Sequence, residues 1–332
     1  MTGTLSPALT VSVVICAYTT ARWDDLCRSV DSVLRQKDPV LELIVVIDHS
    51  EELHDLAASR FTDPSLILLR NMETQGLSGA RNTGVSAARG DIVAFLDDDA
   101  DAAPDWTSAL TRHYLDEDVA GVGGYAAPVW PGLRPAWMPQ EFDWVVGCSY
   151  IGQPTSLAPV RNPIGCNMSL RRSVFSAVGG FRSEVGRVGS TPVGGEETEL
   201  CIRVRSTGAA NTILFDPEMR VQHHVSLDRT SPRYFVRRCY HEGLSKAVVT
   251  EMAKGQQALS TESEYVRAVL PRAVVREVSS VTSAGLARAA MIVVGLAVTT
   301  AGYARAKVSR AVRRQRPAPA ITMPNLQPQW TR

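Results

Sequence analysis

The sequence of 332 residues lacks the motifs that identify several common enzyme classes. It has no GxxxxGKS or GxxxxGKT, no GxSxG, and no glycine-rich turn after its first apolar run, which ends in AYTT. These absences exclude P-loop chemistry, the nucleophile turn of α/β-hydrolases and a dinucleotide-dependent dehydrogenase. The net charge is only +1, which argues against a nucleic-acid partner, because phosphate recognition usually leaves a strongly basic face.

Cysteine is scarce and scattered. The six cysteines form no CxxC pair and have no zinc-like spacing, and the first residues lack the charged-then-apolar pattern of a signal segment. We therefore expect buried free thiols in a reducing compartment and a cytoplasmic protein.

Hydrophobic residues make up 45% of the chain, and in its first third they alternate between β-branched runs and helix-like stretches. This pattern predicts strands at 11–18, 41–48, 65–70 and 91–97, separated by helices. Strands that alternate with helices form parallel βαβ units, and strands that are apolar throughout are covered on both faces. The predicted fold class is α/β, with a mainly parallel open sheet flanked by helices.

Polar residues follow three of these strands, in AYTT, IDHS and DDDAD. Open α/β sheets bind ligands at the carboxyl ends of their strands, so these residues should converge on one crevice. The run Asp97, Asp98 and Asp99 suits a hard divalent cation such as Mn²⁺ or Mg²⁺, although acidic turns also occur as solvated loops. We expect Asp101, just beyond the turn, to be solvated and to lead into a helix after Pro104.

The second half of the chain is less regular. Residues 125–163 are rich in proline, glycine and tryptophan and are predicted to form a long surface loop or lid, in which Trp130, Trp137 and Trp144 either stack on sugars or pack the loop. A strand and short helix at 163–181, a helix at 194–208, a strand at 211–224 and a basic amphipathic helix at 231–249 should follow.

The C-terminal region combines an apolar stretch with a basic one. Residues 289–304 carry no charge but are shorter than the ~20 residues that a membrane-spanning helix needs, and residues 305–316 contain no acid. This combination favours a segment lying on an anionic membrane surface; a packed core helix with a solvated basic tail and an oligomerisation helix are the alternatives. Residues 317–332, with four prolines, are predicted to be a loose tail.

Five ordered motifs within residues 10–250 resemble family 2 glycosyltransferases of the GT-A fold. They are VSVVICAYTTARWDDLCRSVDSVLRQ, LELIVVIDHS, GLSGARNTGVSAARGDIVAFLDDD, GCNMSLRR and GGEETELCIRVRSTG. The resemblance implies a GT-A domain over residues 1–250, with a nucleotide-binding half at about 10–105 and an acceptor half at about 106–250. Residues 251–316 would form a helical, membrane-associated extension.

The resemblance also implies individual roles. The nucleotide sugar would be bound by Ala17, Tyr18, Asp48, Arg81, Asp97 and Asp98. The metal would be bound by Asp99 and His223, with His224 as the rival of His223. Glu197 would be the catalytic base, and the acceptor-side candidates are Asn167, Glu196 and Trp144.

Several of these residues have simpler structural interpretations, and two depart from the family pattern. Tyr18 could merely end a strand, Asp48 could cap the next helix, and Arg81 could pair with a carboxylate. The usual Glu-Asp pair is Glu196-Glu197 here, which lengthens the base by one methylene. The second strand normally ends in two acids, and Ile47 replaces the first of them.

The resemblance implies metal-dependent, inverting transfer of a sugar from a nucleotide-diphosphate donor, with a UDP-sugar as the first choice, to an acceptor hydroxyl. The basic helix at 231–249 and the apolar-basic C-terminal region would suit a lipid-linked or cell-envelope glycan as acceptor, at the inner face of the cell membrane. A soluble acceptor such as a natural product, with an oligomerisation helix at the C-terminus, is the alternative. Two alternatives are a nucleotidyltransferase, which typically has a glycine-rich loop where AYTTARW stands, and a non-catalytic protein that binds sugar nucleotides.

Overall fold

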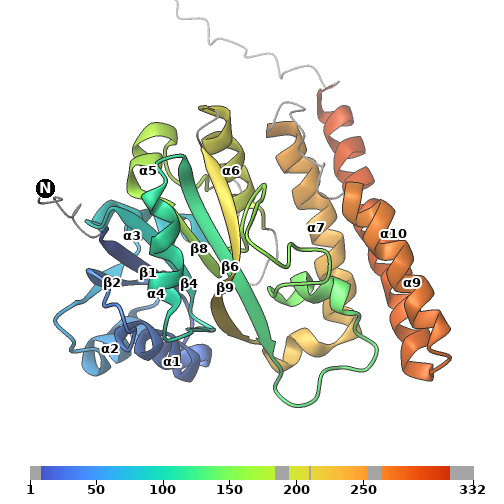
Figure 1. Ribbon diagram of the computed structural model, residues 1–332, viewed down its shortest axis with the longest axis horizontal. Helices are drawn as coiled ribbons and strands as arrows, with labels where there is room; N and C mark the ends of the chain where they lie inside the picture. The colour runs from blue at the N-terminus through green and yellow to red at the C-terminus, as the bar shows by residue number, and fades with distance from the viewer. Residues whose placement is uncertain (1–8, 184–193, 209–210, 253–262, 315–332) are drawn as a thin grey trace, which may run out of the picture.

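The computed structural model describes residues 9–183, 194–208, 211–252 and 263–314 (Figure 1). The predicted tail at 317–332 lies outside these residues. One mixed sheet, with the strand order β3-β2-β1-β4-β8-β6-β9-β5, runs through the centre, and β7 pairs with β9. The predicted fold class is confirmed.

The first part of the sheet is parallel and matches the four predicted strands. These are β1 (Val11–Ala17), β2 (Glu42–Ile47), β3 (Leu66–Arg70) and β4 (Ile92–Asp97). They pair side by side in parallel, so all four carboxyl ends lie at one edge of the sheet. The polar segments AYTT, IDHS and DDDAD therefore share that edge, as expected.

The second part of the sheet has mixed pairing. Its strands are β5 (Ala100–Ala102), β6 (Val119–Val129), β7 (Ala158–Pro159), β8 (Asn167–Arg171) and β9 (Thr212–His224). Strand β8 joins the two parts by running antiparallel to both β4 and β6, whereas β6 and β9 are parallel. The short β5 pairs antiparallel with the end of β9, which brings the chain after Asp99 next to the two histidines.

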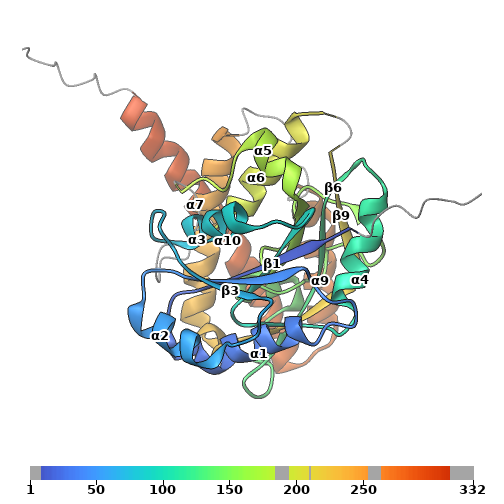
Figure 2. The same ribbon diagram turned by 90° about the vertical axis from the view of Figure 1, so that its left-hand side faces the viewer.

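Helices cover both faces of the sheet, as the uniformly apolar strands require. On one face lie α1 (Trp23–Leu34), α2 (Glu51–Arg60) and α4 (Trp106–Thr111), and on the other α3 (Leu77–Ala87), α5 (Arg172–Val178) and α6 (Glu196–Ser206). Figure 2 shows the sheet between α1 and α2 on one side and α3, α5 and α6 on the other. Along β1 the side chains alternate between the two resulting cores, with Val13 and Ile15 in one and Val14 in the other.

The predicted surface loop or lid at 125–163 is largely wrong. Strand β6 continues to Val129, and residues Gln140–Val146 form a 3₁₀-helix, η3, whose side chains Phe142, Val145 and Val146 are buried. These side chains form a third apolar core with the C-terminal helices. The segment is therefore a packed layer between the sheet and those helices, because its aromatic residues bury against them.

The C-terminal helices are α7 (Pro232–Met252), α9 (Leu270–Ser279) and α10 (Ser283–Arg314), with a π-helical turn, η5, at Tyr265–Val269. Helix α10 packs along α7 through two glycines (Figure 1). A Cβ atom on Gly302 would lie 2.2 Å from the carbonyl oxygen of Tyr240, and one on Gly243 would lie 2.1 Å from that of Thr299. No larger residue fits at either position without separating the helices.

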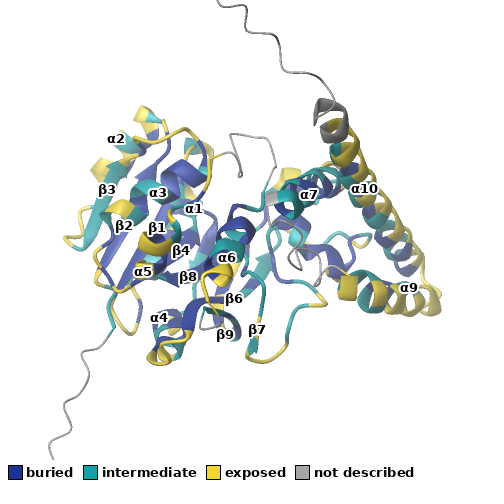
Figure 3. Ribbon diagram, turned by 90° about the horizontal axis from the view of Figure 1, so that it is seen from above, coloured by how far each residue is buried: buried dark blue, intermediate teal, exposed yellow. Residues whose placement is uncertain are grey.

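Helix α10 is longer than the uncharged run at 289–304. This corrects the expectation, based on that run, that the apolar segment is too short to span a membrane. It has 32 residues, and its segment Ser283–Ser309, whose most apolar 18-residue window has a mean hydropathy of 1.7, is long and apolar enough to cross a membrane. Only 22% of the most apolar window is buried in the protein, so the helix is not an ordinary core helix. Figure 3 shows exposed residues along the outer side of α9 and α10.

Candidate active site

A group of three side chains with the donor atoms of a divalent-cation site lies at the end of β4. Asp97, Asp99 and His223 each offer one ligand atom, and these atoms all lie within 4.8 Å of one another. The Nε2 atom of His223 is 3.2 Å from Oδ1 of Asp99. Two carboxylates and an imidazole suit Mn²⁺ or Mg²⁺, so the donor set fits the expected cation.

The pairing of β5 with β9 decides which histidine faces this group. Ala100 lies opposite His223, and the backbone N–H of His224 donates to the carbonyl oxygen of Asp99 at 2.8 Å. Side chains alternate along a strand, so His223 points inward and is buried, whereas the ring of His224 lies 2.8 Å from the Asp101 carboxylate. Asp101 therefore lies in strand β5, and its carboxylate contacts the His224 ring. This corrects the expectation that Asp101 is a solvated residue leading into a helix.

The charges of Asp99 and His223 depend on each other. Burial opposes ionisation of Asp99, but His223, Arg229 and Arg22 outweigh it and hold the pKa of Asp99 below its usual range. Burial also disfavours a charged His223, but the Asp99 carboxylate outweighs it and raises the pKa of His223 to about 10. The histidine must release this proton before it can ligate a cation.

Asp98 lies beside this group and contacts Arg22. An Arg22 Nη atom is 2.9 Å from Oδ1 of Asp98 and 3.1 Å from Oδ2 of Asp99. The other oxygen of Asp98 is buried without a hydrogen-bond partner among the residues that the structure describes. Burial, together with the neighbouring carboxylates and against the opposing charge of Arg22, raises the pKa of Asp98 to about 7.

Arg81 connects the end of β4 to the start of α6. Its guanidinium is 3.2 Å from Glu196 Oε1 and 3.4 Å from Asp97 Oδ1, and it donates to the carbonyl oxygen of Gly165 at 3.1 Å. These distances confirm that Arg81 pairs with carboxylates. Arg81 is only about 2% exposed, and it also borders the cavity described below. Glu196 uses Oε1 for this ion pair, and its Oε2 is buried without a hydrogen-bond partner among the residues that the structure describes.

Glu197, the next residue, faces the cavity and is partly buried. Burial raises its pKa to about 7, with a further contribution from Glu196 and an opposing one from Arg81. A carboxylate with a pKa near neutral is well suited to accept a proton at physiological pH.

The residues expected at the nucleotide lie at the ends of β1 and β2. Asp48 is buried; it accepts hydrogen bonds from the Asn71 amide at 2.6 Å and the Gly76 backbone N–H at 2.9 Å. Ser50 rather than Asp48 caps α2, so the capping interpretation of Asp48 is wrong. Tyr18 is 44% exposed beside Arg22, and Ala17 is buried, so that only its backbone can face a ligand.

The acceptor-side candidates divide into two groups. Asn167 is fully buried, its side chain accepts from the Trp106 indole at 2.8 Å, and it donates to the carbonyl oxygen of Met219 at 2.8 Å. We therefore correct the assignment of Asn167, which is a packing residue that an acceptor cannot reach. Trp144 does line the cavity, whereas Trp137 packs edge-on against Phe235 in the third core.

Two arginines near the metal group were missed from the sequence. Arg22 follows the first strand and contacts both Asp98 and Asp99. Arg229 is buried with its Nη2 atom 3.5 Å from Oδ2 of Asp99. Arg22 lies within the first quoted motif but was given no role, and Arg229 lies in none of the five motifs; the sequence signal they share is that each follows a polar strand end by a few residues.

A cavity of about 990 Å³ connects these residues to the C-terminal helices. Near the metal group it is lined by Arg81, Asp97, His223 and Arg229, and Glu197 lines it next to the Arg81–Glu196 ion pair, between the metal group and α7. The other end is lined by side chains of α7 and α10 and by the loop before β8. The volume is in the range of sites that hold a drug-sized molecule or larger.

Comparisons with known proteins identify the class. Residues 12–179 match the family described as "Glycosyl transferase family 2". The chain is 38% identical over 242 residues to the glucosyl-dolichyl phosphate glucuronosyltransferase of Haloferax volcanii, an alignment that covers 72% of this chain and 77% of the relative. It is 25% identical over 253 residues to the succinoglycan biosynthesis protein ExoM of Rhizobium meliloti, covering 74% and 77% of the two chains.

A solved structure shows the same fold. The mannosyltransferase PcManGT from Pyrobaculum calidifontis, in complex with GDP-Man and Mn²⁺, superposes with a TM-score of 0.57 at 18% identity, covering 93% of this chain and 88% of that one. The chain thus belongs to glycosyltransferase family 2 and is a glycosyltransferase of the GT-A fold. The predicted family, enzyme class and fold are confirmed.

Proposed function

We propose that this protein transfers a sugar, with inversion at the anomeric carbon, from a nucleotide-diphosphate donor to a hydroxyl of a lipid-linked glycan at a membrane surface. The observation that carries the proposal is one cavity that contains Asp97, His223 and Glu197. Residues 10–105 would bind the donor nucleotide, and residues 106–250, with the C-terminal helices, would bind the acceptor.

Asp97, Asp99 and His223 would hold the divalent cation. When bound, Mn²⁺ or Mg²⁺ would supply positive charge that stabilises the departing diphosphate. Arg229, which lines the same end of the cavity and is buried there, would add a fixed positive charge. Mn²⁺ is present in the PcManGT complex and in a second structural neighbour, GalNAc-T7 with UDP, GalNAc and Mn²⁺, which superposes with a TM-score of 0.52 at 18% identity over 76% of this chain and 52% of that one. Both complexes support the choice of cation.

Glu197 would act as the base. The acceptor oxygen forms a bond to the anomeric carbon while the bond from that carbon to the diphosphate oxygen breaks, and the nucleoside diphosphate leaves. The hydroxyl proton goes to the Glu197 carboxylate. Arg81 would position both ends of this reaction, because it contacts Asp97 and Glu196 at once.

Tyr18 and Asp48 would receive the nucleotide. Tyr18 is the exposed aromatic ring at the end of β1, and the Asp48 backbone N–H donates to the carbonyl oxygen of Ala17 at 2.7 Å, which fixes the two strand ends together. The structural neighbours were solved with UDP or GDP-Man, so we retain UDP-sugars as the first choice and GDP-sugars as the second.

Two observations support a lipid-linked acceptor. The relative from Haloferax volcanii is named for a glucosyl-dolichyl phosphate substrate. The outer side of α9 and α10 carries an exposed apolar stripe, formed by Val275, Val278, Val281, Leu286 and Val293. Charged side chains lie among these residues, and an acid-free basic run follows at 305–316. This combination suits contact with an anionic lipid surface, which we place at the cytoplasmic face.

We propose that α10 lies on the membrane rather than crossing it, although its length would allow a span. Its inner side, with Leu296, Thr299 and Tyr303, lines the same cavity as Arg238, Glu242 and Lys246 of α7, so a spanning α10 would draw these charged residues into the hydrocarbon.

The decisive experiment measures the leaving group. The full-length protein, Mn²⁺ and a panel of UDP- and GDP-sugars are first compared by thermal shift, because only the correct donor should stabilise the fold by mass action. Release of nucleoside diphosphate on addition of a polyprenyl-phosphate-linked sugar is the expected result. Release of pyrophosphate would instead show a nucleotidyltransferase, and donor binding without any release would show a non-catalytic binding protein.

A further inference from the structure

The cavity end opposite the metal group is lined by a ladder of charges on α7. Arg238, Glu242 and Lys246 are spaced four residues apart and so lie on one side of the helix, and all three line the cavity. Glu242 is 2.8 Å from Arg238 and 3.1 Å from Lys246, so one acid is shared between two cations. These three side chains together carry two positive charges and one negative charge.

Arg238 is the buried member of the ladder. Its side chain is 9% exposed, and its Nε–H has no acceptor among the residues that the structure describes. The guanidinium also lies over the Trp144 ring, 5.8 Å from the centroid. A buried charged donor without a partner is costly, and such a group is commonly completed by a ligand oxygen.

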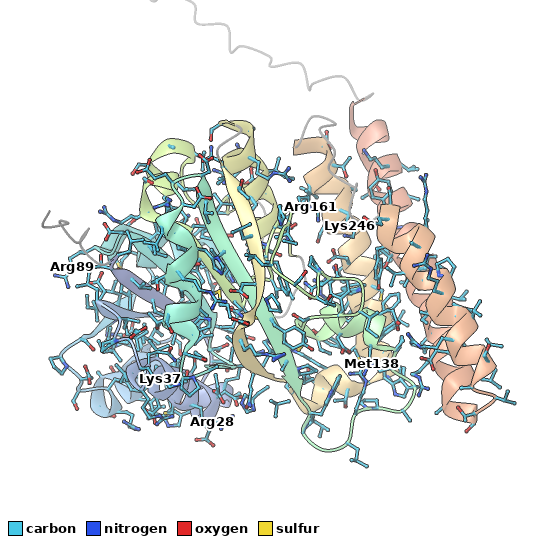
Figure 4. All side chains as sticks on the ribbon, in the orientation of Figure 1. Arg28, Lys37, Arg89, Met138, Arg161 and Lys246 are labelled. Carbon is cyan, nitrogen blue, oxygen red and sulfur yellow. The ribbon has the colours of Figure 1, made fainter. Side chains whose placement is uncertain are left out.

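Across the cavity, Arg161 adds a further cation to this wall. Both Arg161 and Lys246 line the cavity, and Figure 4 labels them in the part of the molecule that lies between the central sheet and the C-terminal helices in that view. Among the residues that the structure describes, the acids that line this cavity are Asp97, Glu196, Glu197, Glu242 and Glu264. Arg238, whose Nε–H has no acceptor among those residues, favours a group with two or more anionic oxygens, since an arginine fork matches phosphate geometry.

The ladder lies next to the proposed base. The backbone N–H of Gly194 donates to Oγ of Ser245 on α7 at 3.3 Å, and a Cβ atom at Gly194 would be 3.6 Å from an Nη atom of Arg238. The segment that leads into Glu196 and Glu197 is thus anchored on α7 beside Arg238. The charges of Glu197 and Arg238 also influence each other, since Glu197 is among the carboxylates that raise the pKa of Arg238 against the effect of burial.

We infer that Arg238, Lys246 and Arg161 form a phosphate subsite that holds the phosphate attached to the acceptor sugar. A phosphate bound there would place the sugar between α7 and Glu197, so that a hydroxyl distant from the phosphate reaches the base. Trp144, in contact with Arg238, would pack against that sugar. This inference rests on the proposed function and specifies the acceptor as a phosphorylated sugar.

The phosphate could belong to a lipid-linked sugar or to a soluble sugar phosphate, and two probes separate these sources. Binding of decyl phosphate and of glucose 1-phosphate to the full-length protein is measured by calorimetry, with Mn²⁺ and saturating UDP or GDP present to occupy the metal end. Decyl glucoside serves as the uncharged control. Tighter binding of decyl phosphate assigns the lipid-linked source, and equal or tighter binding of glucose 1-phosphate assigns the soluble one; both support the subsite.

The variants test the residues. Arg238→Gln should weaken binding of the phosphate probe at least tenfold, Lys246→Met should weaken it several-fold, and Arg237→Gln, an exposed neighbour on the same helix, should change it less than twofold. Two variants are used because Arg238→Gln alone could disturb folding, which thermal melting monitors. Wild-type affinity for the phosphate probe in folded Arg238→Gln and Lys246→Met, or probe binding no tighter than that of decyl glucoside, would overturn the subsite.

Donor binding distinguishes the two proposals. Arg238→Gln should bind the sugar nucleotide and Mn²⁺ within twofold of the wild type, because it lies at the other end of the cavity. If the wild type binds no sugar nucleotide, the proposed function fails, whatever the phosphate probe does. If donor binding is intact and phosphate binding is independent of α7, only the subsite fails.

Discussion

The two ends of the cavity have opposite chemistry. At one end, acids that follow buried strands gather around His223 and would hold a cation. At the other, Arg238 and Lys246 on a helix surround a single glutamate and would hold an anion. A transferase that joins a diphosphate donor to a phosphorylated acceptor must keep two anionic groups apart while their sugars meet. The contrast between the ends would achieve this separation, with Glu197 between them.

Removing the base should have the largest effect. Glu197→Gln keeps the size of the side chain but cannot accept a proton, so turnover should fall by about a thousandfold, within the range for general-base catalysis. Donor affinity, measured by thermal shift, should stay within twofold. Glu52→Gln, on the exposed surface of α2, is the control. Turnover near the wild-type level in Glu197→Gln would contradict the role of Glu197 as the base.

The neighbouring histidines provide a matched test of the cation end. His223→Ala should weaken activation by Mn²⁺ by about a hundredfold, because it removes an inward-facing ligand, and losses of this order accompany disruption of metal ligation. His224→Ala should change Mn²⁺ activation less than threefold. Titration of activity with Mn²⁺ measures both. Equal effects of the two substitutions would contradict the assignment from the β5–β9 register.

The pH dependence of activity tests Glu197, the residue between the two ends of the cavity. A base must be deprotonated to act, and burial raises the pKa of Glu197 to about 7. Activity at low substrate should therefore rise about tenfold per pH unit below pH 6 and level off above about pH 8. A base with an ordinary glutamate pKa would instead give a constant rate from about pH 6 upward. Rates are measured across this pH range at a Mn²⁺ concentration that saturates the enzyme at every pH. The pH dependence of metal binding then does not affect the comparison of the two profiles.

The smallest effect is expected from substitutions in the exposed apolar stripe of α9 and α10, on the side proposed to face the membrane. Val278→Ser and Val293→Ser each remove exposed apolar area, worth about 1 kcal/mol on full transfer, so each should lower binding to vesicles containing anionic lipid by about three- to fivefold. Leu133→Ser, in the exposed turn after β6, is the control. Sedimentation with vesicles measures the bound fraction. Unchanged vesicle binding together with a monomer–dimer shift would assign the stripe to self-association.

The cation end could be predicted from the sequence because local patterns specify it. The strands that carry AYTT, IDHS and DDDAD are short apolar runs, and their parallel pairing places their ends together. The choice between His223 and His224 could not be made in this way, since it depends on the register between β5 and β9, which are more than a hundred residues apart. Asn167 was misassigned for the same reason: its partners Trp106 and Met219 come from distant segments.

The anion end was hardly visible in the sequence. The helix at 231–249 was recognised as basic, but nothing local shows that its charged side faces a cavity rather than solvent. The layer around Phe142 was taken for a surface loop, because proline and glycine are typical of loops and its burial depends on helices that follow much later. The length of α10 was underestimated because a helix continues through charged residues that end an apolar run.

The two glycines at the α7–α10 crossing would also set the height of the proposed anion end above a lipid surface. Gly243 and Gly302 bring the helix backbones so close that α7 and α10 must move together. If the outer side of α10 rests on the headgroups, the ladder of charges on α7 would lie about one helix diameter above them, roughly 10 Å. A lipid-borne phosphate would then need to rise only that far, and a bulkier residue at either glycine would lift the ladder away from the membrane.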